Sequence, residues 1–365
     1  MTEAINKINL LNFNQNDLAA FFVASGEKSF RAMQIIKWIH QQSVTDFAAM
    51  TNLSMKLRAW LQENTEIKLP TIKTEQLSKD GTRKWLLALA DNQLIEMVFI
   101  PSFADESEDL LSRGTLCISS QVGCPLNCGF CATATQGFTR NLTVAEIISQ
   151  VWLAVNILAN KSCELSPVKQ HNISNIVLMG MGEPLLNFDN VIKAMDLMMD
   201  DNAYGLSKYR VTVSTSGIVP ALRQLCDASQ VSLAVSLHAP NDELRNQLMP
   251  INKKYPLHEL MAACKTYFQD SRRKITFEYT MIAGVNDQER HAHQLIKLLT
   301  GVSCKINLIP FNPFHGCAYQ CSASQTIEKF RAILLNAGLN TIVRKTRGSD
   351  INASCGQLVA KKLAI

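Results

Sequence analysis

The sequence has no apolar run that approaches the roughly 20 residues needed to cross a bilayer. Its N-terminus lacks the basic, apolar and small-residue regions that make up a secretory signal. It also contains no internal repeat and no low-complexity tract. These absences count against a membrane protein and a secreted protein, and we expect a cytosolic one.

Cysteine, by contrast, is plentiful, since the 365 residues include 11 of them. In a long cytosolic chain, reduced thiols serve metal binding or catalysis more readily than they form a disulfide framework. Hydrophobic residues make up 47% and charged residues 18%, a composition that supports a sizeable core. The net charge of +5 favours an anionic partner such as nucleic acid, although many basic enzymes bind no polyanion.

The first third of the chain contains two different patterns. Residues 1–75 have a helical pattern, in which Phe30, Met33 and Ile36 follow one apolar stripe. Two strand-like runs, 84–90 and 93–100, flank an Asp-Asn pair and predict a β-hairpin. The acidic residues 105–109 are typical of a solvated linker. We therefore expect a helical accessory domain over 1–75, followed by a hairpin and linker over 76–110.

From Gly114 onward, short strands rich in Val, Ile and Leu alternate with helical patterns. Repeated βα units predict a parallel sheet whose active site lies at the carboxyl ends of its strands. About six units are too few for an eight-fold barrel, so the expected α/β fold is a partial (β/α)6 barrel over 111–365. Its strands are expected at 115–119, 173–179, 210–214, 231–237, 274–282 and 304–309.

Cys124, Cys128 and Cys131 follow the first expected barrel strand with a C-x3-C-x2-C spacing. Thiolates are soft ligands that suit iron–sulfur clusters and zinc. A structural zinc site uses four ligands, and a fully ligated cubane uses four cysteines. Three cysteines in one loop would leave one iron of a [4Fe-4S] cluster open to substrate. The alternative is a zinc knuckle that borrows a remote fourth ligand.

This three-cysteine loop resembles that of the radical S-adenosylmethionine (SAM) superfamily, in which the open iron binds the amino and carboxylate groups of SAM. The resemblance implies one [4Fe-4S] cluster per chain, SAM, and a 5′-deoxyadenosyl radical formed on reduction. Residues 180–184 look like the superfamily's glycine-glutamate-proline element, with Glu183 placed to accept from the SAM ammonium group. The pattern also fits a plain turn.

Small and polar residues recur at the ends of the expected strands, where a parallel sheet forms its site. Hydroxyl groups such as that of Ser214 suit a ribose or a carboxylate, and Asn312 suits adenine or ribose. The SAM contacts that we expect are Gly182, Glu183, Ser214, Ser236, Leu237, His238 and Asn312.

Two outlying cysteines narrow the choice of enzyme. Cys117 lies on the first barrel strand, and Cys355 lies beside a glycine near the C-terminus. Either one alone would be taken for an unreactive buried thiol. With these two cysteines, nearly the whole chain resembles the bacterial dual-specificity RNA methyltransferases of the RlmN family. The most specific segments are the cysteine loop, 180–184, 236–240 and 347–357. Ser354 departs from the family pattern, which has alanine there.

The resemblance implies methylation of C2 of an adenosine in 23S rRNA, at the peptidyl transferase centre, and of an adenosine in tRNA. Cys355 would first take a methyl group from one SAM. A radical made from a second SAM would remove hydrogen from that S-methyl group, and its carbon would add to C2. Cys117 would then attack Cys355, release the product and leave a transient disulfide, which a reducing cytosol can reverse.

Removal of the C2 proton needs a base, and Glu96 is an acid inside the apolar run 94–98. Burial would raise its pKa into a range useful for proton transfer. The pattern fits an edge-strand glutamate facing water equally well, and the family resemblance favours the proton acceptor.

The resemblance also implies partners: 23S rRNA and tRNA, bound in part by the 1–75 domain, and an electron donor such as flavodoxin or ferredoxin. We expect a monomer with no membrane association. The basic residues Arg344, Lys345 and Arg347 flank Cys355 and are the first candidates for phosphate contact, although such clusters more commonly form a solvated surface. These residues do not distinguish an enzyme that methylates C2 from a relative that methylates C8 of the same ribosomal adenosine. A zinc-dependent, non-catalytic RNA-binding protein is the alternative of another class.

Overall fold

The structure is a computed structural model that describes residues 7–102, 111–160, 170–268 and 273–360. The acidic linker expected at 105–109 lies outside these ranges. Within them, no helix is both long enough and apolar enough to span a membrane.

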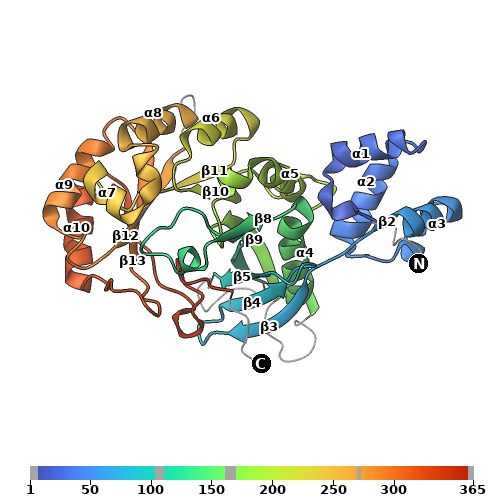
Figure 1. The fold of residues 1–365 in the computed structure, drawn as a ribbon, viewed down its shortest axis with the longest axis horizontal. Helices are drawn as coiled ribbons and strands as arrows, with labels where there is room; N and C mark the ends of the chain where they lie inside the picture. The colour runs from blue at the N-terminus through green and yellow to red at the C-terminus, as the bar shows by residue number, and fades with distance from the viewer. Residues whose placement is uncertain (1–6, 103–110, 161–169, 269–272, 361–365) are drawn as a thin grey trace.

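The N-terminal part is a small helical unit (Figure 1). Asn14 and Ser54 act as N-caps, because their side chains accept from backbone N–H groups in the first turns of α1 and α3. The buried faces of these helices belong to the same apolar core as the barrel, which explains the stripe in the sequence. The elements are β1 (Ile8–Asn9), α1 (Gln15–Ala24), α2 (Arg31–Ile36), a π-helical turn (Lys37–Gln41), α3 (Met55–Asn64) and β2 (Thr65–Glu66).

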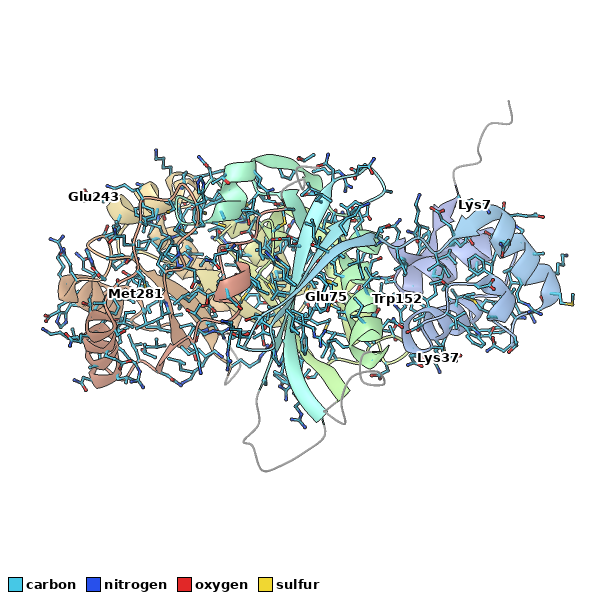
Figure 2. The ribbon with its side chains drawn as sticks, turned by 90° about the horizontal axis from the view of Figure 1, so that it is seen from below. Lys7, Lys37, Glu75, Trp152, Glu243 and Met281 are labelled. Carbon is cyan, nitrogen blue, oxygen red and sulfur yellow. The ribbon has the colours of Figure 1, made fainter. Side chains whose placement is uncertain are left out.

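This unit is held against α4 (Val144–Asn160) and α5 (Phe188–Met199). Trp152 lies at the junction (Figure 2), and its indole N–H donates to the carbonyl of Ile39 over 2.8 Å. Lys193 pairs with Asp17 at 2.6 Å. Hydrogen bonds and apolar packing thus attach the helical unit to the rest of the molecule.

A ten-stranded sheet forms the body of the protein, in the order β14-β13-β12-β11-β10-β9-β6-β5-β4-β3. Its first part is antiparallel: β3 (Thr71–Leu77), β4 (Arg83–Ala88), β5 (Leu94–Pro101) and β6 (Leu111–Cys117). The expected hairpin is confirmed as β4 and β5. The helical pattern assigned to 1–75 was wrong at its end, because the β-branched residues Thr71, Ile72 and Thr74 belong to the edge strand β3.

The parallel part of the sheet starts at β6 and confirms all six expected barrel strands. After β6 come β9 (Gln170–Leu178), β10 (Val211–Thr215), β11 (Ser232–Ser236), β12 (Ile275–Met281) and β13 (Cys304–Pro310). A seventh strand, β14 (Thr341–Val343), pairs with β13 and was not expected. Its three residues are too few for a sequence pattern.

Helices cover the outer face of the parallel strands, and the sheet curves without closing (Figure 1). Besides α4 and α5 they are α6 (Val219–Ala228), α7 (Asp242–Leu248), α8 (Leu257–Tyr267), α9 (Glu289–Leu298) and α10 (Ser324–Asn336). A small hairpin of β7 (Gln121–Gly123) and β8 (Phe138–Asn141) brackets the cysteine loop. The fold is thus the expected partial barrel.

Candidate active site

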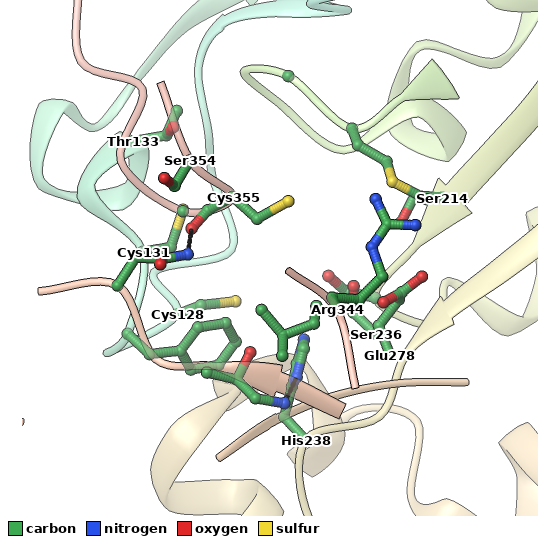
Figure 3. A pocket seen from close by; sticks show the side chains of 18 of the residues that line it. Cys128, Cys131, Thr133, Ser214, Ser236, His238, Glu278, Arg344, Ser354 and Cys355 are labelled. Atoms are coloured by element: carbon green, nitrogen blue, oxygen red, sulfur yellow. Dashed lines mark hydrogen bonds between the residues drawn. The ribbon is translucent and has the colours of Figure 1, made fainter. Parts of the chain in front are cut away.

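A pocket lies at the carboxyl ends of the parallel strands, where the cysteine loop, the strand ends and the C-terminal segment meet (Figure 3). Most of the residues singled out from the sequence line it: Cys124, Cys128, Cys131, Gly182, Glu183, Ser214, Ser236, His238, Asn312 and Cys355. Leu237, Cys117 and Glu96 do not line it.

The three cysteines of the loop sit close to one another on one wall. Burial, with smaller contributions from the neighbouring Cys131 and Glu183, raises the pKa of Cys124 to about 12. The pKa of Cys128 is raised well above its usual range, first by burial and then by Cys131 and Cys124. The raised pKa values of Cys124 and Cys128 mean that a positive group would be needed to stabilise their thiolates.

This donor set fits a cluster better than a single metal ion. In the described part of the chain, no three His, Cys, Asp or Glu side chains converge to hold one ion. A cubane separates its ligands, because each cysteine binds a different iron, and soft thiolates suit that iron. The Phe130 ring packs edge-on against His238, with centroids 4.5 Å apart, and covers the loop on the pocket side.

Glu183 is almost fully buried and already holds two backbone groups. Its carboxylate accepts from Leu185 N over 3.1 Å and from Ser216 N over 2.7 Å. Burial raises the pKa of Glu183, although these hydrogen bonds oppose the shift. Gly182 has φ of 103°, and a Cβ there would lie 2.5 Å from the Gln121 side chain, so only glycine fits.

His238 and Asn312 are both hydrogen-bonded within the pocket wall. Nδ1 of His238 accepts from Thr280 N over 3.0 Å, and burial lowers the pKa of His238 to about 3, so the ring is neutral. Asn312 donates to the carbonyl of Cys355 over 3.1 Å. Leu237 is buried below the pocket surface, and its backbone N–H donates to Glu278 O over 3.0 Å.

Cys355 lies on a loop that runs from β14 back to the cysteine cage. Gly356 O accepts from Ala132 N over 2.7 Å, and Leu358 O accepts from the Thr133 hydroxyl over 2.8 Å. Cys355 is an exposed residue that lines the pocket, and desolvation of its thiol by the surrounding protein raises its pKa. The loop therefore presents a thiol beside the cage (Figure 3).

Cys117 closes β6 and is buried. Burial raises its pKa to about 12; nearby Cys355 adds to this rise, and Arg344 opposes it. The two thiols are therefore electrostatic neighbours, although they are 238 residues apart in the sequence (355 minus 117). Every cysteine in the described ranges is a free thiol, so the transient disulfide expected between these two is not formed here.

Glu96 lies on β5 and is buried, as one of the two sequence interpretations required. It forms an ion pair with Lys84 at 3.1 Å and accepts from Val359 N over 2.9 Å. Because side chains alternate along a strand, Glu96 shares a face of β5 with Val98, whose cross-strand partner is Cys117. Glu96 thus lies on the Cys117 side of the sheet.

Of two charged residues that line the pocket, only one was considered from the sequence alone. Arg344, considered there only for phosphate, lines the pocket and acts electrostatically on both thiols. Glu278 was missed: it lines the pocket, is 7% exposed and accepts from Asn307 over 2.9 Å. Burial raises its pKa. An acid inside the apolar strand β12 was the available signal, the same one that marked Glu96.

Comparison with known proteins agrees with this geometry. Residues 8–67 match the family described as the ribosomal RNA large subunit methyltransferase N-terminal domain, and residues 118–296 match the radical SAM superfamily. A solved structure of a radical SAM methyltransferase from Sphaerobacter thermophilus is 39% identical, over 97% of this chain and 100% of that one, with a TM-score of 0.86.

More distant matches include a domain of a pyruvate-formate lyase-activating enzyme from Bacteroides vulgatus. It is 17% identical, over 47% of this chain and 99% of that one, with a TM-score of 0.37. SuiB from Streptococcus suis, bound to SAM, is 13% identical, over 62% of this chain and 49% of that one, with a TM-score of 0.43.

Proposed function

Because this chain belongs to the radical SAM methyltransferases of the RlmN type, we propose that it methylates C2 of adenosine in 23S rRNA and in tRNA through a methylated cysteine. The observation that carries the proposal is the pair of thiols. Cys355 faces the pocket beside the three-cysteine loop, and it lies close enough to the buried Cys117 to raise the pKa of that thiol. A methyltransferase that passed its methyl group directly to a nucleophilic substrate atom would need neither thiol.

Membership implies a [4Fe-4S] cluster and SAM, which together supply a one-electron cleavage that yields a carbon radical. Cys124, Cys128 and Cys131 would hold the cluster. Glu183 and the strand-end residues Gly182, Ser214, Ser236, Leu237, His238 and Asn312 would hold SAM. Of these, Leu237 would act through its backbone, because its side chain is buried away from the pocket.

The chain's own residues would divide the remaining work. The Cys355 sulfur carries the methyl group, and the pocket around it keeps the reactive carbon away from water. Once that carbon is bonded to C2, the adduct radical would return one electron to the reducing system and Glu96 would accept the C2 proton. Cys117 would then lose its proton to solvent, and its thiolate would attack the Cys355 sulfur. The bond from Cys355 to the product carbon would break with its electron pair on that carbon, which takes up a proton to become the methyl group, and a disulfide would remain to be reduced.

The direct test is anaerobic reaction of the cluster-loaded enzyme with methyl-labelled SAM and either a 23S rRNA fragment or tRNA. We expect 2-methyladenosine in both RNAs by mass spectrometry of the digested nucleosides. Cys355→Ala should abolish the product and keep its iron and sulfide, and the exposed Cys321→Ala should behave as wild type. Product from Cys355→Ala contradicts the proposal, and 8-methyladenosine establishes the C8 alternative.

The partners and organisation that we propose follow from the same family. The partners are 23S rRNA, tRNA and a small electron donor such as flavodoxin or ferredoxin. The enzyme would be a monomer in the cytoplasm. Residues 1–75 would form an RNA-binding accessory domain, 76–110 a hairpin and linker, and 111–365 the radical SAM barrel with its cysteine loop. Zinc in place of iron and sulfide in the purified protein would favour the non-catalytic RNA-binding alternative.

A further inference from the structure

Arg245 is a fully buried arginine on α7 that does not line the pocket. Its guanidinium donates four hydrogen bonds: to Leu237 O at 3.1 Å, Ser236 O at 3.0 Å, Ser216 O at 2.7 Å and Asn252 Oδ1 at 2.8 Å. All four acceptors are neutral, and within the described ranges Arg245 forms no ion pair with a carboxylate. Burial lowers the pKa of Arg245 to about 10, which leaves the side chain charged at neutral pH.

A buried cation of this kind is costly, and packing alone does not explain it. Removing a charge from water without an ion-pair partner costs free energy, which hydrogen bonds offset only in part. An apolar side chain of similar volume would fill the same space without that cost. The nearest acid, Asp242, is reached only through Asn252, which donates to it over 2.8 Å. The charge of Arg245 and its planar set of N–H donors therefore need a functional explanation.

The carbonyls that Arg245 binds belong to the ends of two neighbouring strands. Ser216 follows β10, Ser236 ends β11, and Leu237 follows it. The Ser216 peptide is held from both sides, because its N–H donates to Glu183 and its carbonyl accepts from Arg245. Arg245 thus joins the Glu183 carboxylate to the two strand ends through a single chain of hydrogen bonds.

The same helix reaches the cysteine loop. Leu248 O, at the end of α7, accepts from Gly129 N over 3.0 Å, and Gly129 lies between Cys128 and Cys131. Arg245 lies three residues before Leu248 on the same helix, so its fixed charge stands about one helical turn from the backbone contact with the Cys128–Gly129 peptide. A fixed positive charge near a cluster ligand stabilises the more negative, reduced form of a cluster.

We propose that Arg245 is a positioning residue for the radical chemistry: it holds the ends of β10 and β11 in register with Glu183 for SAM, and its charge beside Cys128 favours cluster reduction. The inference rests on the proposed cluster and SAM sites and does not depend on which RNA atom is methylated. The proposal gives α7 a role in the active site, one layer behind the residues that line the pocket.

Arg245→Lys and Arg245→Met separate the two tasks. Lysine keeps the charge but cannot reproduce the planar fork, and methionine removes both. Arg223→Met, an exposed arginine on α6, is the matched control. For each cluster-loaded variant we would measure iron and sulfide content, the SAM dissociation constant by calorimetry, and the cluster midpoint potential by a redox titration followed by electron paramagnetic resonance.

We expect Arg245→Lys to bind SAM at least tenfold more weakly with an unchanged potential, and Arg245→Met to show weaker binding and a lower potential. Wild-type SAM affinity in Arg245→Lys overturns the positioning role, and a wild-type potential in a loaded Arg245→Met overturns the electrostatic one. If Arg245→Met cannot be loaded, Arg245→Gln, a neutral side chain that can still donate, takes its place. Wild-type enzyme that binds SAM but makes no methyladenosine would refute the proposed function and leave these measurements valid.

Discussion

The two catalytic thiols proposed here have different surroundings at the residue scale. Cys355 faces the pocket, where a methyl donor and an RNA base can reach it. Cys117 is buried, and burial raises its pKa to about 12, so it is a protonated thiol at neutral pH. A protonated thiol is a poor nucleophile. If Cys117 resolves the adduct as proposed, we therefore expect its deprotonation to limit the release of the product.

Cys117→Ala should stop the reaction after the carbon–carbon bond forms. We expect a covalent RNA–protein adduct, seen as a shifted band on a denaturing gel that nuclease treatment removes. The buried Cys264→Ala, on α8, is the matched control and should give no adduct. If Cys117→Ala turns over normally, another thiol resolves the adduct.

The raised pKa of Cys117 also predicts a pH dependence. Below this pKa, the thiolate fraction rises about tenfold for each pH unit. We therefore expect the rate of adduct resolution, measured by rapid quench, to rise from pH 7 to pH 9 by up to about 100-fold, until another step limits it. A flat profile would mean that resolution does not wait for Cys117 to lose its proton.

Glu96 is held by Lys84 and by Val359 N, so it has both a structural contact and a proposed chemical role. Glu96→Gln keeps an acceptor for Val359 N and removes the base. We expect it to form methylated Cys355 normally and to make product about 100-fold more slowly. Mass spectrometry of the protein and of the RNA measures the two steps separately. Loss of both steps would mean that Glu96 serves mainly to anchor the C-terminal segment, and Lys84→Met would then show the same loss.

At the scale of elements, the turn between β3 and β4 holds the Cys355 loop. Asp80 accepts from Gly348 N over 2.9 Å, and Asp350 accepts from the Ser78 hydroxyl over 2.6 Å and from Lys79 N over 3.2 Å. Gly348 has φ of 63°, and a Cβ there would lie 2.8 Å from Ala353 Cβ, so the loop turns only with glycine. The antiparallel extension of the sheet is thus a support for the Cys355 loop.

Asp80→Ala should loosen this loop without unfolding the barrel. We expect faster hydrogen exchange over 347–356 and faster alkylation of Cys355, compared with the exposed Asp227→Ala on α6 as control. Unchanged exchange and alkylation would show that the turn does not restrain the loop.

The same contact should weaken in acid. Burial acts to raise the Asp80 pKa, but hydrogen bonds from Gly348, Thr82 and Ser78 outweigh it and lower the pKa to about 2. Because this is below the unfolded value of about 3.9, the contribution to stability is present above about pH 4 and is lost as the pH falls through about 2. The loop should therefore become more exchangeable in that acidic range in wild type, and Asp80→Ala should lack the transition.

For the molecule as a whole, a net charge of +5 and the basic loop beside Cys355 favour RNA binding that weakens with salt. Arg344→Ala should reduce the slope of log affinity against log salt by about 1, as expected when one phosphate contact is lost. Lys265→Ala, on the outer helix α8, is the control. Filter binding of tRNA over a range of salt measures the slopes, and equal slopes would place Arg344 away from phosphate.

Much of this protein was predictable from the sequence because the deciding signals are local. The cage cysteines fall within eight residues of one loop (124 to 131), so their spacing marks a thiolate site, and the family resemblance then indicates its chemistry. The alternation of strands with helices is read from periodicity within each segment, and it predicted the hairpin and six parallel strands. Because the carboxyl ends of parallel strands meet at one edge of a sheet, the sequence also predicted that Ser214, Ser236 and Asn312 line one pocket.

Tertiary structure alone decided the contacts between distant segments. The pairing of Glu96 with Lys84, the support of the Cys355 loop by Asp80, and the clamp that Arg245 places on Ser216 and Ser236 depend on how whole elements pack. Short-range patterns carry no information about such pairings, because the free energy of a buried charge is set by neighbours that folding brings from elsewhere in the chain. The sequence by itself determined the kind of radical enzyme, and the packing of the sheet and α7 decided how its cysteines, Glu96 and Arg245 are held.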